Sequence, residues 1–185
     1  MTTSTAPEQT DIFAEALGYY EALLGGFQSI ILGTVSAEGR PEASYAPAIV
    51  DEKRNFYVYV SALAAHTANL EASHQASVLV IEDEAGARQL FARQRATFDC
   101  EAELIERHNT EWELRLDAME EKFGSLIKHL RTLEDFSLFR LKPRSGRLVT
   151  GFARAFQITG ERFDELDHRR GIDGKGHVSE KKSTN

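Results

Sequence analysis

The residues best suited to chemistry in this sequence are scattered histidines, arginines and carboxylates. They do not form a compact catalytic motif. The chain has no phosphate-binding loop, no Gly-x-Gly-x-x-Gly fingerprint, no His-Glu-x-x-His zinc motif and no Gly-x-Ser-x-Gly nucleophile elbow. Any site must therefore be assembled by the fold from residues that lie far apart in the sequence.

Near the C-terminus, His177 follows two glycines in the run Gly174-Lys175-Gly176-His177. Glycine lets a backbone approach a ligand closely, and a neutral imidazole is a common metal ligand. A histidine in this setting could be a metal or haem ligand that orders the tail on binding. The alternative is a solvated histidine in a flexible terminus. His168 competes with it as the tail ligand.

Asp135 follows the longest predicted helix. A carboxylate in such a place can accept the second N–H of a ligating imidazole, which fixes the tautomer of the ring and raises its basicity. The alternative is a charge at the helix exit that faces solvent.

Arg93 and Arg95 alternate in the run 90–95. We expect a strand here, which would place both guanidinium groups on one face. That arrangement suits a ligand that carries carboxylates or phosphates. The alternative is a solvent-facing pair on the outside of the fold. His66, just before a short predicted helix, is either a cap or surface residue or a further cofactor contact.

The bulk composition fits one globular domain in a chain of 185 residues, 42% of them hydrophobic. A formal net charge of -7 disfavours nucleic acid as a partner, because phosphate affinity requires clustered Lys and Arg.

The single cysteine, Cys100, rules out an internal disulfide and is expected to pack as a small apolar residue. The N-terminus does not resemble a secretory signal, and no apolar run could span a bilayer, so we expect no membrane partner and a cytoplasmic protein.

Hydrophobic periodicity predicts three helices and a set of antiparallel strands. The helices are expected at 11–24, 67–74 and 109–130. The strands are expected at 30–36, 41–50, 56–60, 76–81, 88–105, 136–141 and 147–158, with a turn at 143–146 between the last two. We divide the chain into a flexible tail over 1–10, a folded domain over 11–160 and a polar C-terminal tail over 161–185. The expected architecture is a small, mainly β, antiparallel barrel with peripheral helices.

The order of these elements resembles the pyridoxamine-phosphate-oxidase-like split barrel, also known as the FMN-binding split barrel. The first hairpin, from Leu32-Gly33-Thr34-Val35 to Gly39-Arg40-Pro41, and the strand Tyr57-Val58-Tyr59-Val60-Ser61 carry this likeness. The runs 90–95, 147–156 and 174–177 resemble one branch specifically, the haem-utilisation proteins of the HutZ and HugZ type.

This resemblance implies a homodimer with haem near the subunit interface. It also implies cleavage of the porphyrin by oxygen and an electron donor, either a reductase or a small molecule, with release of iron, a biliverdin-type product and carbon monoxide. By the same resemblance, His177 is the proximal iron ligand, Asp135 pairs with that ligand, and Arg93 or Arg95 faces the haem.

Two alternatives stay open beside a haem-degrading oxygenase. One is a haem storage or trafficking protein without turnover. The other is an FMN-dependent oxidoreductase of the same fold. FMN is the less favoured ligand, because flavin-binding relatives carry basic residues before the short helix and this chain has Ala64-Ala65-His66 there.

Overall fold

Most strands in this chain alternate buried and outward-facing residues, as expected for a sheet with one face against a core. In β1, Ile30, Leu32 and Thr34 are buried while the residues between them are more exposed. The computed structural model describes residues 6–168. Its strands are β1 Ser29–Val35, β2 Pro41–Val50, β3 Phe56–Ser61, β4 Gln75–Ile81, β5 Arg95–Ile105, β6 Phe136–Gly151, β7 Arg154–Thr159 and β8 Glu165–His168.

Six of these strands close into a barrel. They follow the order β3-β2-β1-β4-β5-β6, and β3 pairs with β6 to complete the ring. All the neighbouring pairs are antiparallel. The predicted antiparallel split barrel is therefore confirmed.

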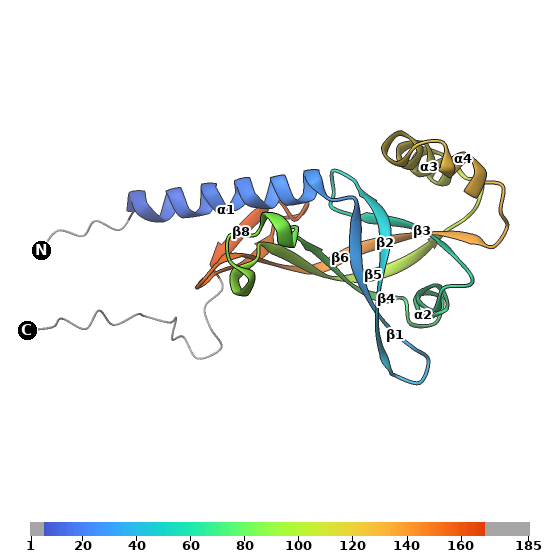
Figure 1. The fold of residues 1–185 in the computed structure, drawn as a ribbon, viewed down its shortest axis with the longest axis horizontal. Coiled ribbons are helices and arrows are strands. Elements are labelled where there is room, and N and C mark those ends of the chain that lie inside the picture. The colour runs from blue at the N-terminus through green and yellow to red at the C-terminus, as the bar shows by residue number, and fades with distance from the viewer. Residues whose placement is uncertain (1–5, 169–185) are drawn as a thin grey trace, which may run out of the picture.

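β6 belongs to two parts of the sheet. Its first half, up to Leu141, pairs with β3, while its second half, from Gly146, pairs with β7, and β8 then adds to β7. Both halves pair with β5 through a register shift at Asp99 and Cys100. The sheet thus divides at the middle of β6 (Figure 1).

The turn predicted at 143–146 was wrong, because these residues stay extended within β6. Pro143 lies opposite Cys100 at the register shift, which is a position where a strand tolerates proline. The strand predicted over 88–105 was too long, because Leu90–Ala92 form a 3₁₀ turn (η2) and β5 begins only at Arg95. A second 3₁₀ turn, η1, covers Glu84–Gly86.

The helices lie around the barrel: α1 Ala6–Gly26, α2 Ala65–Ser73, α3 Thr110–Phe123 and α4 Leu126–Leu130. Figure 1 shows α1 running along the β8 side and α3 with α4 at the opposite end. None of the helices within 6–168 is long and apolar enough to cross a membrane.

The single helix predicted over 109–130 is two helices. Gly124 ends α3 with a φ of 84°, a conformation that favours glycine. After the break, Ile127 is 7% exposed and faces the core, whereas Leu126 is 61% exposed.

Two hydrophobic clusters result. One fills the barrel and the space beneath α1, and it includes Tyr20, Phe56 and Phe98. The other packs α3 and α4 against the outside of the barrel through Tyr59 and Trp112.

Residues 165–168, which we placed in the C-terminal tail, pair with β7 and extend the sheet.

Gly146 is needed where β6 crosses the core. A Cβ at this position would lie 3.0 Å from Ile158 Cβ and 3.1 Å from Phe98 Cδ1. We expect Gly146→Ala to lower the free energy of unfolding by about 1–3 kcal/mol through overpacking, as measured by urea denaturation. Gly18→Ala is the control, because Gly18 has open space around it in α1 and should gain roughly 0.5–1 kcal/mol. Equal stability of Gly146→Ala and the wild type would contradict this account.

Candidate functional site

Asp135 lies where the closing pair of barrel strands begins. β3 pairs with β6 in a register that sets Ser61 opposite Phe136, so Asp135 comes next to the end of β3. Ser61 Oγ donates to Asp135 Oδ2 at 2.9 Å, and the Ala62 N–H donates to the Asp135 carbonyl at 2.7 Å. The carboxylate is exposed but held in one place by both its side chain and its backbone.

The same serine also anchors the following helix. Thr67, in the first turns of α2, donates from Oγ1 to the Ser61 carbonyl at 2.6 Å. α2 carries His66 as its second residue. Asp135 and the His66 helix are therefore fixed to the same short turn, 61–64, although they are almost 70 residues apart in sequence.

His66 is buried, with 9% of its surface exposed. Its Nδ1 lies 3.0 Å from Ser44 Oγ, and Ser44 Oγ lies 3.3 Å from the Leu32 carbonyl oxygen. With the Ser44 hydroxyl turned to the Leu32 carbonyl, Nδ1 donates to Ser44; with the hydroxyl turned to the ring, Nδ1 accepts instead. In both tautomers Nε2 is buried without a hydrogen-bond partner in the described part of the chain.

Burial lowers the pKa of His66, and the carboxylate of Glu42 opposes this only partly. In the tautomer with the proton on Nδ1, the neutral ring can accept a hydrogen bond or bind a metal through Nε2. An unpaired, buried ring nitrogen of this kind fits a site that a ligand or partner completes.

Arg93 and Arg95 do not share a strand face, so that prediction was wrong. Arg93 lies between η2 and β5, where its guanidinium bonds Glu84 at 2.8 Å and also the Glu82 carbonyl. It thereby ties together the turn beside the end of α1. Arg95 begins β5 and donates from Nη1 to the Arg93 carbonyl at 2.9 Å.

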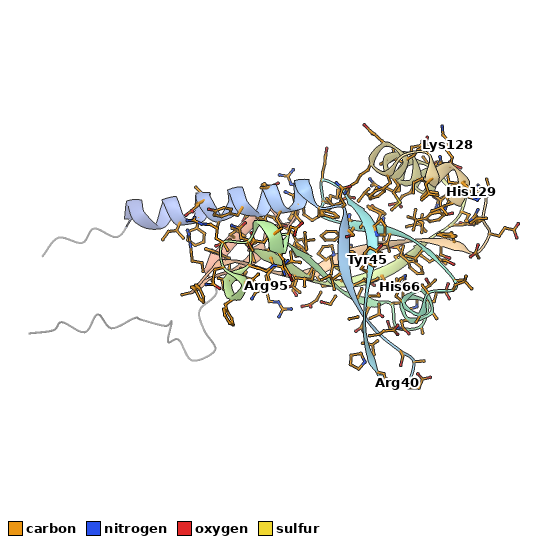
Figure 2. All side chains as sticks on the ribbon, in the orientation of Figure 1. Arg40, Tyr45, His66, Arg95, Lys128 and His129 are labelled. Carbon is orange, nitrogen blue, oxygen red and sulfur yellow. The ribbon has the colours of Figure 1, made fainter. Side chains whose placement is uncertain are left out.

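Arg95 has no carboxylate partner within residues 6–168, so its charge is available to a ligand. Figure 2 shows Arg95 well apart from His66 along the long axis of the molecule. One copy of the chain therefore does not bring Arg95 and His66 together.

The proposed iron ligand His177 lies outside the residues that the structure describes, so its role stays a prediction. His168 is the last described residue, at the end of β8 and opposite Phe156 in the backbone register. Within 6–168 no group of three or more His, Cys, Asp or Glu could hold a metal ion.

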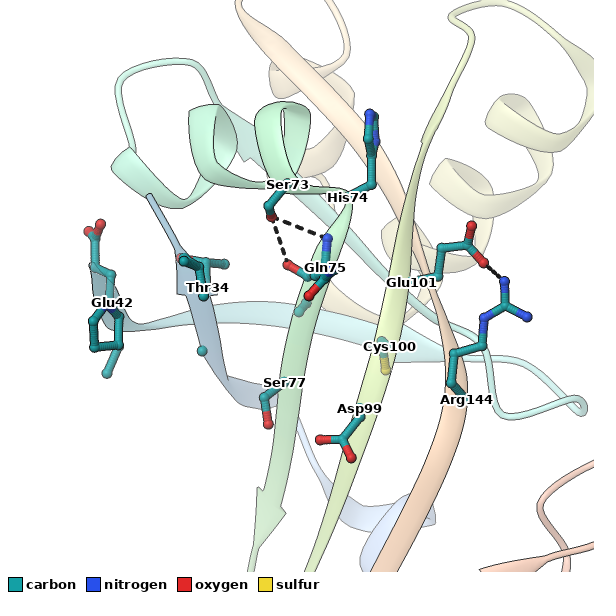
Figure 3. Close-up of a pocket in the computed structure, with 15 residues that line it drawn as sticks. Thr34, Glu42, Ser73, His74, Gln75, Ser77, Asp99, Cys100, Glu101 and Arg144 are labelled. Atoms are coloured by element: carbon teal, nitrogen blue, oxygen red, sulfur yellow. Dashed lines mark hydrogen bonds and ion pairs between the residues drawn. The ribbon is translucent and has the colours of Figure 1, made fainter. Parts of the chain in front are cut away.

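A hollow of about 900 Å³ lies on the outer side of β1, β4 and β5 (Figure 3). His74, Cys100 and the Glu101–Arg144 ion pair are among the groups that line it. None of the predicted site residues lies there. Cys100 is buried, which confirms its expected packing, and burial raises the pKa of its thiol.

Two serines that hold the site, Ser44 and Ser61, were missed by sequence reasoning. Serine is common on strands, and nothing in the local pattern marks these two. Only the pairing of β1 with β2 and of β3 with β6 shows their partners.

Comparison with known proteins now places the chain. A family described as pyridoxamine 5'-phosphate oxidase matches residues 19–150. Heme oxygenase HutZ of Vibrio cholerae is 43% identical over 141 residues, which span 76% of this chain and 80% of the relative. The chain belongs to the HutZ family. The resemblance seen in the sequence is thereby confirmed.

Solved structures of HutZ-type proteins agree. The crystal structure of HutZ from Vibrio cholerae, described there as a heme storage protein, has a TM-score of 0.68 and 40% identity, over 73% of this chain and 94% of that one. The crystal structure of ChuZ from Campylobacter jejuni has a TM-score of 0.77 and 27% identity, over 90% of this chain and 66% of that one.

The state of His66 can be tested in the haem-free protein. Because burial favours the neutral ring, the unfolded chain binds a proton more readily than the folded chain once the pH falls below about 6.5. The free energy of unfolding of the wild type should therefore fall as the pH is lowered from 7 towards 5, and His66→Gln should weaken this dependence. The exposed His129 provides the control variant His129→Gln. A His66→Gln slope identical to that of the wild type would disprove the assignment.

Proposed function

We propose that this HutZ-type protein binds haem between two copies of the chain and degrades it with oxygen and an electron donor. Iron and a biliverdin-type product are released, and the donor is a reductase or a small molecule. The observation that carries the proposal is the site itself: a buried imidazole with a free Nε2 and a fixed carboxylate, anchored on one turn, in a chain 43% identical to a protein named heme oxygenase.

The separation of Arg95 from His66 within one chain supports a site completed by a second copy. The outer face of the barrel offers an apolar surface for such a homodimer. Ile31 on β1 and Tyr45 on β2 are cross-strand neighbours, 43% and 67% exposed. An exposed apolar pair on a regular sheet face is typical of an interface.

We assign roles to the residues as follows. His177 ligates the iron, and Asp135 accepts a hydrogen bond from the other ring nitrogen of a ligating imidazole. Arg95 pairs with a haem propionate, because its charge has no carboxylate partner in the described chain, whereas Arg93 is already bonded to Glu84. His66 faces the bound haem or its ligand through Nε2. The acidic chain has no role with nucleic acid, and we place the reaction in the cytoplasm.

Storage or trafficking of haem without turnover is the second candidate, favoured by the description of HutZ as a heme storage protein. An FMN-dependent activity has less support. At the start of α2 the chain offers only the neutral His66 where a flavin phosphate would need cations.

Titration of the purified protein with hemin, followed by ascorbate in air, tests the proposal. We expect a Soret band that saturates near one haem per chain and then decays to a biliverdin-like spectrum. His177→Ala should change the Soret band through loss of the iron ligand, while the control His168→Ala should not. A stable Soret band would move the assignment to storage, and no Soret band at all would reject haem.

Asp135→Asn tests the carboxylate. An amide cannot supply the charge that strengthens a ligating imidazole, so we expect ring opening to slow by about 10- to 100-fold with little change in unfolding free energy. Glu134→Gln is the matched control, because Glu134 is the exposed neighbour on the same loop. Equal rates for Asp135→Asn and wild type, with the same haem spectrum, would remove Asp135 from the mechanism.

A further inference from the structure

The loop that carries Asp135 runs from the end of α4 at Leu130 to the start of β6 at Phe136. A helix of five residues ends here, and helix ends leave carbonyl groups without partners inside the helix. Such groups need donors from elsewhere, because an unpaired polar group away from water is costly. The hydrogen-bond donors that reach these carbonyls determine how strongly the loop 131–136 is fixed in place.

Backbone N–H groups bond the last carbonyls of α4, and one side chain bonds three carbonyls further along. Arg107, in the turn between β5 and α3, donates from Nη2 to the Arg131 carbonyl at 2.9 Å. Its Nη1 donates to the carbonyls of Leu133 at 3.0 Å and Phe136 at 3.1 Å. A planar guanidinium can serve three diverging carbonyls in this way, because its donors form a rigid fork.

Arg107 is itself well fixed. Its guanidinium lies 5.2 Å from the centre of the Trp112 ring, and Trp112 is only 2% exposed. Tyr59 Oη lies 3.4 Å from Nη1. Within residues 6–168 Arg107 forms no ion pair with a carboxylate, so its strong contacts are the loop carbonyls.

Asp135 therefore lies in a loop bonded from two sides. Arg107 holds the carbonyls before and after it, and the turn at Ser61 and Ala62 holds its own carbonyl and carboxylate. The charges of Arg107 and Asp135 both act on the pKa of the Tyr59 hydroxyl. Burial raises the pKa of Tyr59, the charge of Arg107 lowers it, and the charge of Asp135 raises it.

We propose that Arg107 is a positioning residue for Asp135, holding the loop 131–136 so that the carboxylate stays bonded to Ser61 and faces the haem site. The part that concerns haem rests on the proposed function. The part that concerns the loop does not, so the two can be tested separately.

The loop is tested by amide hydrogen exchange on the haem-free, full-length protein. The reporter is the Ala62 N–H, which bonds the Asp135 carbonyl. Arg107→Ala should speed its exchange by about tenfold relative to amides of the β4–β5 ladder, and Arg107→Lys, which keeps the charge but not the fork, should lie in between.

Arg115→Ala is the matched control. Arg115 also stacks on a buried aromatic ring, at 4.3 Å from the centre of Tyr57, and bonds Asp51, but it does not touch the loop. Its loss should leave the relative exchange of Ala62 unchanged. Unchanged exchange in Arg107→Ala, or equal acceleration of all barrel amides, would overturn the proposal.

The haem part is tested by ring opening with hemin and ascorbate. Arg107→Ala should slow the reaction in the same direction as Asp135→Asn, and the double variant should be no slower than Asp135→Asn alone. A wild-type rate in Arg107→Ala, or fully additive losses, would overturn it. If the wild type binds no hemin, the proposed function fails while the exchange measurement still decides whether Arg107 holds the loop.

Discussion

The pairing of β3 with β6 is the contact on which the rest of the structure depends. It closes the barrel, and its last register position, Ser61 opposite Phe136, brings the turn before α2 to the loop after α4. Asp135, Ser61 and the start of α2 meet because of this pairing. No shorter-range contact in the described chain could bring these segments together, since they come from opposite halves of the sequence.

The split of β6 serves a second purpose. One strand of 16 residues gives its first half to the closed barrel and its second half to the extension formed by β7 and β8. The Asp135 loop and the β7–β8 extension are thus linked by a single strand. The close contact of Gly146 with Phe98 and Ile158 keeps this strand against the core at the point where the two parts divide.

Much of the fold followed from the sequence. Hydrophobic periodicity predicted the strands of the barrel and the helical region that contains α3. The break at Gly124 was missed because the apolar spacing continues across it, and the extended path through Pro143 was missed because proline and glycine there are typical of a turn. In both places long-range packing, which the local sequence does not contain, decides the conformation.

The candidate site was less predictable. Asp135 and His66 could be singled out by residue type and by family resemblance, but their anchors could not, because Ser44, Ser61 and Arg107 act through bonds to segments distant in sequence. The shared strand face predicted for Arg93 and Arg95 was wrong because side chains alternate only inside a strand, and β5 begins at Arg95.

The position of α1 has a consequence for how the chain is made. Its buried residue Tyr20 donates to the carbonyl of Phe163, 143 residues later, and its Phe13 packs on Phe156 of β7 at 5.6 Å. At about 5–20 residues per second, a ribosome needs roughly 7 to 30 s to synthesise the 143 residues that separate these partners. During that time Phe13 lacks its partner on β7, although Tyr20 can already pack on Phe98 of β5. The first helix therefore reaches its final packing only after the last strands have been synthesised.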